Sequence, residues 1–334
     1  QPATKLALAT RKQLAPTLQM ILRATQKTVK KPEDYLTGAA HPAVFDAARL
    51  DVEAMVRMAH EMTPDALPPL VALRTIKDAA AVPGVDFFDL RPEGLFDTPF
   101  AIARVVRGVA RDRRMTLEAG IMAAAGTPPP QYLWVVLQGD PKKLSIKPLT
   151  ANASQVELTV SYHGVYRPAD ASGEPAPMMS GRADVGCFVK SGAYYSPPAI
   201  VSFYCLPNEV RVYRDDGQIL SVDYTNAAHR YADPALTLQK GWKDLYEYDG
   251  QGRMLGWYRT RAGGPAERFT WQGYRVLATD KQNRPARACA VQYLPRQSGG
   301  ENMPPALSCA DLPQQYTFAY ADDADKLGKV SAAK

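Results

Sequence analysis

Thr116-Leu-Glu-Ala-Gly120 is the first of five short apolar segments that decide the fold class of this chain. The other four are Gln131-Tyr-Leu-Trp-Val-Val-Leu-Gln-Gly-Asp-Pro141, Val156-Glu-Leu-Thr-Val-Ser-Tyr-His-Gly164, Arg182-Ala-Asp-Val-Gly-Cys-Phe-Val-Lys-Ser-Gly192 and Ala199-Ile-Val-Ser-Phe-Tyr-Cys205. Between 156 and 162 apolar and polar residues alternate one by one, which is the pattern of a strand with one buried face. The stretch therefore predicts a β-sandwich.

Shifts in composition divide the 334 residues into five parts. We expect a helical segment over 1–81, a linker loop rich in Pro, Gly and Asp over 82–99, the sandwich over 100–206, an antiparallel sheet over 207–321 and a charged, frayed tail over 322–334. The predicted fold class is α+β and multidomain, because a helical N-terminal segment precedes a sandwich and a C-terminal antiparallel β-meander.

Helical periodicity is confined to the first part of the chain. Residues 5–30 predict one kinked helix or two short ones, because Pro16 interrupts the pattern. Residues 42–61 predict the strongest helix, with Pro42 in its first turn and an apolar stripe through Phe45, Ala48, Val52, Met55 and Ala59. A shorter helix is expected over 70–76. The periodicity of residues 100–107 does not decide between strand and helix.

A quasi-repeat follows residue 207. Tyr213-Arg-Asp-Asp-Gly-Gln-Ile-Leu220 aligns without gaps on Tyr248-Asp-Gly-Gln-Gly-Arg-Met-Leu255, and Asp280-Lys-Gln-Asn-Arg-Pro285 repeats the same turn. Gly217, Gly252 and Asn283 occupy the equivalent position, where a positive φ is least costly for Gly or Asn. Each copy predicts a hairpin, and together they predict the meander.

The central stretch resembles the polycystic-kidney-disease-type and receptor-for-egg-jelly-type immunoglobulin-like domains of secreted bacterial proteins. The resemblance rests on residues 116–120, on Tyr132-Leu-Trp134 with Gly139-Asp-Pro141, and on the segments 182–190 and 199–205. It implies an immunoglobulin-like sandwich with Trp134 in its core. Ala123-Ala-Ala-Gly-Thr-Pro-Pro-Pro130 replaces the acidic turn of many relatives and offers few oxygen ligands, so we expect no metal there.

The C-terminal repeat resembles YD-type hairpins, most clearly in Tyr246-Glu-Tyr248-Asp249 with Gly252-Arg253. In that family the motif is structural. The whole chain also resembles uncharacterised secreted proteins of planctomycete-type bacteria, a resemblance that implies no activity.

The net charge of the chain and its first residues give information about its binding partners and its cellular compartment. The net charge is +6, and its densest basic group lies in the first forty residues: Lys5, Arg11, Lys12, Arg23, Lys27, Lys30 and Lys31. We interpret this group as a solvated helix face, since no nucleic-acid motif accompanies it. No run of eighteen apolar residues predicts a membrane-spanning helix. The start at Gln1 fits a mature secreted chain, and equally a trimmed chain or a fragment.

Four cysteines all lie in the second half of the chain, and no C-x-x-C spacing suggests a zinc site. Of the three possible pairings we favour the one between sequence neighbours, Cys187 with Cys205 and Cys289 with Cys309. Such bridges indicate a periplasmic or extracellular protein. The alternative is four free thiols in a cytosolic protein.

The sequence carries no motif for catalysis. It lacks a nucleophile elbow, a P-loop and a dinucleotide-binding glycine pattern, so no cofactor is expected. His60-Glu61 begins like a metalloprotease motif, but Pro64 stands where the second ligand is needed. Structural roles are favoured for the four histidines, His41, His60, His163 and His229. A hydrolase with a site between the helices and the sandwich, using His60, Glu61 or Asp86, remains one alternative.

Aromatic residues supply the candidate ligand-binding positions: Tyr194, Tyr195, Trp242, Trp257, Tyr258 and Trp271. Neighbours such as Trp257 and Tyr258 face opposite sides of one strand, so some rings are expected on the surface, where they can stack on sugars or on proteins. The alternative is that they cover the second face of the sheet. We expect a non-catalytic secreted or periplasmic protein with a structural or binding role, in adhesion, in scaffolding or as an accessory module, and a protein or polysaccharide partner outside the cytoplasm. A carbohydrate-binding module is the second hypothesis.

Overall fold

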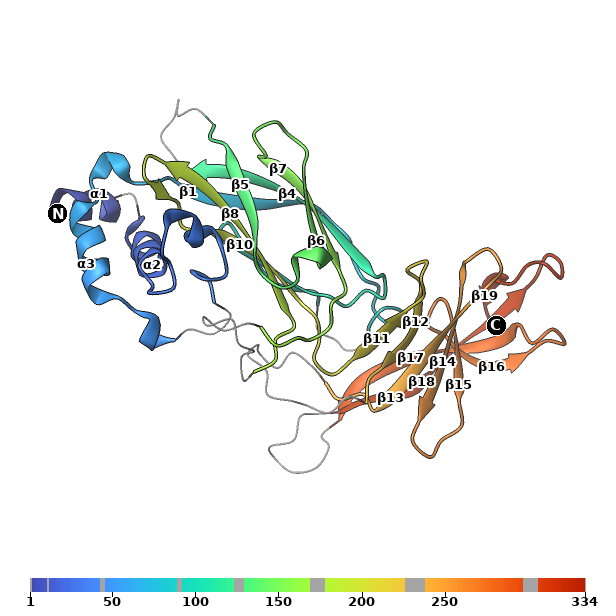
Figure 1. Cartoon of the computed structure of the whole chain (residues 1–334). Helices are drawn as coiled ribbons and strands as arrows, with labels where there is room; N and C mark the ends of the chain where they lie inside the picture. The colour runs from blue at the N-terminus through green and yellow to red at the C-terminus, as the bar shows by residue number, and fades with distance from the viewer. Residues whose placement is uncertain are drawn as a thin grey trace.

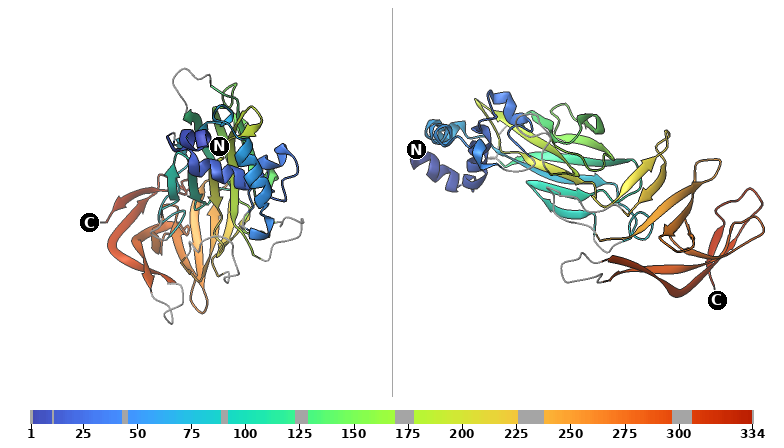
Figure 2. Two further views of the ribbon diagram at one scale, coloured as in Figure 1. Left: turned by 90° about the vertical axis from the view of Figure 1, so that its left-hand side faces the viewer. Right: turned by 60° about the horizontal axis from the view of Figure 1, so that its bottom comes forward.

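The computed structural model describes residues 2–10, 12–42, 46–88, 92–122, 129–168, 178–225, 238–296 and 306–333, and the protein is mostly β with several sheets. The molecule is elongated. Helices gather at one end, two sheets form the middle, and a third sheet lies at the other end (Figure 1, Figure 2). The order of these parts along the long axis follows the order of the chain.

The N-terminal end contains three α-helices, α1 (Pro2–Thr10), α2 (Leu14–Ala24) and α3 (Val52–Glu61), with short 3-10 turns η1 (Pro32–Leu36), η2 (Ala47–Arg49) and η3 (Pro64–Ala66). Residues 5–30 thus form two helices, and Pro16 lies in the first turn of α2, where its missing N–H is not needed. The helix expected over 42–61 begins only at Val52, because the Asp51 carboxylate accepts a hydrogen bond from the amide of Ala54 (2.9 Å) and caps it there. Residues 43–45 of that prediction lie outside the described residues.

Two β-sheets form the middle of the molecule, with the strand orders β1-β4-β7-β6 and β2-β3-β10-β8-β5, and β9 pairs with β8. Both sheets contribute to one hydrophobic core, with Leu117 and Val156 from the first sheet and Val185 and Val201 from the second. The strands are β1 (Leu70–Asp78), β2 (Gly94–Thr98), β3 (Ala101–Val105), β4 (Asp112–Met122), β5 (Tyr132–Gln138), β6 (Leu144–Pro148), β7 (Gln155–Ser161), β8 (Arg182–Ser191), β9 (Tyr194–Tyr195) and β10 (Ala199–Tyr204), with a 3-10 turn, η4 (Pro141–Lys143), before β6.

The five segments that open the sequence analysis are confirmed as strands, in β4, β5, β7, β8 and β10. Alternation is confirmed in β7, where Val156, Leu158 and Val160 are buried and their neighbours are partly exposed. Trp134 is half-buried against the core, and its indole Nε1 donates to the carbonyl of Ala153 (2.9 Å). Local sequence patterns therefore predicted these five strands correctly, and alternation did so for β7.

Three predictions about secondary structure are wrong. Residues 70–76 are not a helix but part of β1, which pairs antiparallel with β4 from Leu70 opposite Met122 to Asp78 opposite Met115. Burial of Leu70, Val71 and Leu73 against the sheets outweighs their helical propensity. The linker 82–99 contains β2, and the tail expected to fray contains β19 (Lys329–Ala332), which pairs with the preceding strand. The segment 100–107, which could have been a strand or a helix, contains strand β3, and β3 pairs in parallel with β10.

Strand β8 is covered on both faces. Every residue from Ala183 to Val189 is buried, as expected of a strand with a layer on each side. Cys187 faces the core between the two sheets, whereas Phe188 faces the other way and packs with Leu137 against the helices. The helices and turns before β1 thus form a cap on the outer face of the second sheet, packed through Met20, Ile21, Tyr35, Ala40, Met62 and Leu67.

The C-terminal part is a nine-stranded antiparallel meander in which the strands follow sequence order. They are β11 (Val210–Tyr213), β12 (Ile219–Asp223), β13 (Trp242–Tyr248), β14 (Met254–Arg261), β15 (Glu267–Thr270), β16 (Arg275–Thr279), β17 (Pro285–Arg296), β18 (Ala306–Ala319) and β19. The predicted turns are confirmed: Gly217, Gly252 and Asn283 have φ of 86°, 78° and 59°. A fourth copy that the sequence analysis missed runs from Thr270 to Tyr274, with the same pair of backbone hydrogen bonds and Gly273 at φ 86°.

All four cysteines are free thiols, and the predicted pairing is wrong: Cys187, Cys205, Cys289 and Cys309. The strand register gives the reason. Cys187 pairs with Ala199, six residues before Cys205 along β10, and Cys309 pairs with Tyr293, four residues beyond Cys289 along β17. At about 3.3 Å per residue these offsets are roughly 20 and 13 Å, whereas a disulfide needs Cα atoms within about 7 Å.

The loop before β2 and strand β11 join the sheets in the middle to the C-terminal sheet. Phe88 from the loop is buried in the aromatic core of the C-terminal sheet, with its ring centroid 4.9 Å from that of Tyr293. In β11, Arg211 donates to the carbonyls of Val106 (3.0 Å) and Arg107 (3.3 Å) while its Nε bonds Glu209 (2.9 Å). These buried contacts hold the two parts of the molecule together.

Candidate functional site

A cavity of about 280 Å³ lies where the N-terminal cap meets the β8–β9 hairpin. Its lining comes from segments far apart in sequence: Met20, Ala24, Val29, Lys30, Lys31, Pro32, Tyr35, Met58, Ala193, Tyr194 and Tyr195. The volume is close to the lower limit of typical small-ligand sites. Apolar side chains, three tyrosines and two lysines thus converge on one hollow.

Local sequence positions the aromatic wall of this cavity. Lys190 and Ser191 of β8 pair with Tyr195 and Tyr194, and the two residues between them form the hairpin turn. Gly192 has a φ of 56°, the conformation that the first central residue of a type II′ turn requires. This tight turn folds both tyrosines back against the cap, where Tyr195 stacks on Tyr35 with ring centroids 6.3 Å apart.

The opposite wall is positioned by turn η1. The Asp34 carboxylate accepts hydrogen bonds from the backbone amides of Lys30 (2.9 Å) and Lys31 (3.1 Å), and these bonds lower the pKa of Asp34. The chain therefore turns at this point, and Pro32 begins the 3-10 turn that places Tyr35 in the interior. The lysines remain exposed at the edge of the cavity.

Buried polar groups hold Tyr35 in place behind the cavity. The Tyr35 hydroxyl donates to the carbonyl of Ser196 (3.2 Å), and burial raises its pKa. The His41 ring packs on Tyr35; its Nε2 lies 2.8 Å from the Tyr35 carbonyl and its Nδ1 lies 3.2 Å from Arg23 Nη1. Burial, with the nearby Arg23 charge, lowers the pKa of His41 to about 3. A neutral His41 that donates from Nε2 and accepts at Nδ1 satisfies both contacts.

A second cavity of about 220 Å³ lies beside α2, and its lining carries no charged side chain: Ala15, Pro16, Gln19, Leu70, Val71, Phe100, Pro197 and Pro198. Gln19 is the one polar side chain among these lining residues, so the second cavity offers fewer groups that could orient a ligand than the first. The first cavity is therefore the stronger candidate, and the second provides a matched control.

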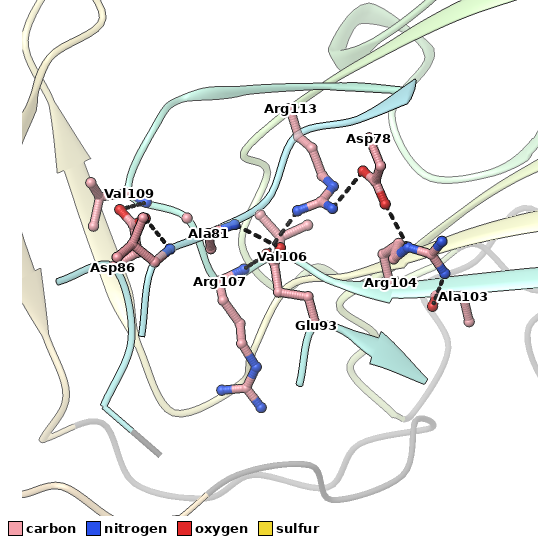
Figure 3. Close-up of polar contacts among 12 residues, drawn as sticks. Asp78, Ala81, Asp86, Glu93, Ala103, Arg104, Val106, Arg107, Val109 and Arg113 are labelled. Atoms are coloured by element: carbon pink, nitrogen blue, oxygen red, sulfur yellow. Dashed lines mark hydrogen bonds and ion pairs between the residues drawn. The ribbon is translucent and has the colours of Figure 1, made fainter. Parts of the chain in front are cut away.

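A network of buried charges surrounds the loop before β2 (Figure 3). Asp78 accepts from Arg104 Nε and Arg113 Nη2, each at 2.7 Å, and Glu93 accepts from Arg113 Nη1 at 2.7 Å. Backbone amides of Ala81 and Arg107 also donate to Glu93. Every oxygen of the two carboxylates thus accepts a hydrogen bond, so the network ties the loop to β1, β3 and β4 and leaves neither carboxylate poised as a base.

A second buried ion pair lies in the C-terminal sheet. Arg259 and Asp244 are fully buried and form two hydrogen bonds, at 2.8 Å from Nε and 2.7 Å from Nη2, while Arg259 Nη1 contacts the Tyr293 hydroxyl at 2.8 Å. Burial opposes the charge of the guanidinium, but the attraction of Asp244 and Tyr293 outweighs it and raises the pKa of Arg259. Aromatic rings enclose this pair, which marks it as part of the core.

The structure separates the six aromatic residues that the sequence suggested for ligand binding. Tyr194 and Tyr195 line the first cavity. Trp242 and Trp257 are buried with Phe88 in the core of the C-terminal sheet, so they are not on the surface. Tyr258 lies half-buried on the opposite face, which confirms that Trp257 and Tyr258 point in opposite directions, and Trp271 is 42% exposed in the turn before β16. No single surface gathers them.

The residues suggested for a hydrolase do not converge. His60 and Glu61 are exposed at the end of α3, within the cap. Asp86 accepts hydrogen bonds from the amides of Val82 (2.7 Å) and Val109 (3.4 Å), in the loop that packs on the C-terminal sheet. His41 is buried as described above, and the His163 ring packs edge-on against Tyr166. His229 and most of the turn from 123 to 130 lie outside the described residues.

Among the described residues no group of three or more His, Cys, Asp or Glu is placed to hold a metal ion. Within the same ranges, no helix has both the length and the apolar character needed to cross a membrane. Cavity residues that the sequence analysis missed include Met20, Tyr35 and Met58, since nothing in a single sequence indicates that position 35 meets position 195.

A scan against protein-family models finds no match for this chain, and a search of the curated proteins finds none either.

Proposed function

We propose that this is a non-catalytic binding protein whose ligand site is the cavity between the N-terminal cap and the β8–β9 hairpin. The observation that carries the proposal is the convergence of Tyr35, Tyr194 and Tyr195 with Lys30 and Lys31 around one hollow of about 280 Å³. Apolar pockets with a few convergent polar groups are the usual form of small-ligand sites.

We propose a non-catalytic role because the buried polar groups are engaged in structural contacts. The carboxylates of Asp78, Glu93 and Asp244 are paired with arginines, and His41 is held by backbone and arginine contacts. A general base needs a free lone pair facing a substrate. These groups are instead committed to holding loops and strands in place.

In the proposal the two sheets in the middle form an immunoglobulin-like module and the meander is a YD-like sheet. The single core between the two sheets supports the first assignment, and the repeated turns at Gly217, Gly252 and Asn283 support the second. A periplasmic or extracellular location stays a prediction, and the free thiols remove the argument from disulfides. A carbohydrate-binding surface also stays a prediction, and Trp242 and Trp257, two of the residues suggested for it, are buried in the core of the C-terminal sheet.

Blocking the cavity tests the proposal. Ala193 is exposed at the mouth of the cavity, so Ala193→Trp should fill it, while Ala15→Trp makes the same change at the second cavity. We expect fragments of roughly twelve heavy atoms to bind with a Kd on the order of 0.1–1 mM. Saturation-transfer NMR should detect fragments that bind the native protein and Ala15→Trp but not Ala193→Trp. A fragment library without any such hit would contradict the proposed function.

A further inference from the structure

We propose that the cavity under the cap is selective for a small apolar carboxylate. The inference rests on the proposed function and adds the chemical class of the ligand. It follows from the arrangement of charge and apolar surface: cationic groups lie at the edge of the hollow, and apolar side chains with aromatic rings lie within.

The edge carries the ammonium groups of Lys30 and Lys31, and the Asp34 carboxylate exerts a coulombic attraction on Lys31. Within the described ranges, neither the Lys30 nor the Lys31 ammonium group lies within 4.0 Å of a carboxylate. The hydrogen bonds of the Asp34 carboxylate go to the backbone amides of these two lysines. Lys190 is not among the lining residues, and its Nζ lies 5.3 Å from the centroid of the Tyr195 ring. An anion at the edge of the cavity would be attracted by Lys30 and Lys31.

The interior is suited to an apolar tail. Met20, Ala24, Val29 and Met58 line it together with the tyrosines, and methionine side chains adapt to irregular apolar shapes. An engineered cavity of about 150 Å³ holds benzene. A hollow of about 280 Å³ therefore has room for one ring with a short chain.

The edge favours a carboxylate over a phosphate group. Phosphate sites in proteins commonly combine an arginine fork, or several backbone amides that point at the anion, with lysines that act as point charges. Here the amides of Lys30 and Lys31 already donate to Asp34, and the lining contains no arginine. Lysine ammonium groups at an exposed edge suit a single negative charge, and they repel an amine.

Three ligands with the same four-carbon chain on a phenyl ring test the inference: 4-phenylbutyrate, its isosteric amide 4-phenylbutyramide, and the amine 4-phenylbutylamine. Their affinities are measured by NMR titration of the whole protein at pH 7.5 and low ionic strength. We expect the carboxylate to bind about tenfold more tightly than the amide, the size expected of two exposed ion pairs, and the amine to bind weakest. Raising the salt concentration to about 0.5 M should reduce the difference in affinity between the carboxylate and the amide, because salt screens the exposed lysine charges.

Charge variants test whether Lys30 and Lys31 cause the preference for the carboxylate over the amide. Lys30→Gln with Lys31→Gln should lower the affinity for the carboxylate to that for the amide, and should leave the amide unchanged. Lys281→Gln with Lys329→Gln removes the same charge from exposed positions in the C-terminal sheet and should change neither affinity.

The outcomes separate the two proposals. If all three ligands bind equally and Ala193→Trp abolishes their binding, the carboxylate inference is overturned and the proposed function stands. The inference is likewise overturned if none of the three binds while other fragments still occupy the cavity. If no fragment distinguishes Ala193→Trp from Ala15→Trp, the proposed function fails as well.

Discussion

Replacing Asp244 by asparagine should destabilise the C-terminal sheet strongly. The substitution keeps the shape of the side chain but removes the charge that balances the Arg259 guanidinium. Both side chains are 0% exposed, so water cannot take over the lost interaction. Removing one partner of a buried ion pair costs about 3–5 kcal/mol.

The surrounding rings reduce this cost. The Arg259 guanidinium carbon lies 4.2 Å from the Trp242 ring centroid and 4.3 Å from that of Phe88. Desolvated cation–π contacts are worth about 2 kcal/mol or more, and those of Arg259 persist in the variant. We therefore expect a net loss of about 1–3 kcal/mol for Asp244→Asn. With a urea m-value of about 2 kcal/mol/M, the unfolding midpoint should fall by roughly 0.5–1.5 M.

Tryptophan fluorescence during urea unfolding measures this effect, because Trp242 and Trp257 both lie in the affected core. Glu118→Gln makes the same chemical change at an exposed ion pair with Arg74 and should leave the midpoint unchanged. The triple variant Asp244→Leu, Arg259→Met, Tyr293→Phe removes the whole polar cluster and should recover most of the stability. The reasoning is refuted if Asp244→Asn costs under about 1 kcal/mol, or if the triple variant is as unstable as the single one.

Three further predictions concern turns, thiols and pH. Gly273→Ala should lower the stability of the C-terminal sheet by more than Gly263→Ala. Both glycines have a positive φ, but a Cβ at Gly273 would lie 2.4 Å from a backbone carbonyl oxygen of the loop before β2. Equal shifts of the melting temperature in the two variants would contradict this close contact. The intact mass of the protein without reductant should show four free thiols, and a mass deficit of two hydrogens would reveal a disulfide bridge. A thiol reagent should modify Cys309 first, because Cys309 is half-buried whereas burial raises the pKa of Cys205 to about 11. The cap should lose stability as the pH falls from about 6.5 towards 3, because the unfolded chain protonates His41 near pH 6.5 whereas the folded state does so only at about 3. In melts of the native protein and of His41→Asn, this part of the pH dependence should be absent from the variant, and identical pH profiles would exclude the buried neutral histidine as its source.

Local patterns were sufficient wherever the structure depends on neighbours in sequence. The alternation from Val156 to Val160 predicted which face of β7 is buried, since side chains in a strand point to opposite sides in turn. Gly217, Gly252 and Asn283 predicted the hairpin turns, since a positive φ is a property of single residues. The fourth turn was missed because Thr270 stands where two of the other copies carry an aspartate, although Gly273 repeats the backbone conformation.

Long-range contacts account for the wrong predictions. The segment from Leu70 becomes a strand because β4, which lies some forty residues later in the chain, pairs with it. The intrinsic propensity of the segment gives no information about this distant pairing partner. Sequence proximity suggested the disulfides, but strand register separates Cys187 from Cys205. Trp242 is buried because Phe88, from a loop more than 150 residues earlier, fills the core beside it.

The sequence by itself determined the five central strands, the three repeated turns and the chemical character of the groups at the candidate site: basic residues at 30 and 31, and aromatic rings at 194 and 195. Only the tertiary structure decided that these groups share one cavity, with Tyr35 stacked on Tyr195 across 160 residues of chain. The physical reason is that burial of both faces of β8 brings the cap onto the second sheet. That packing depends on the summed apolar surface of many distant residues, which no local pattern records.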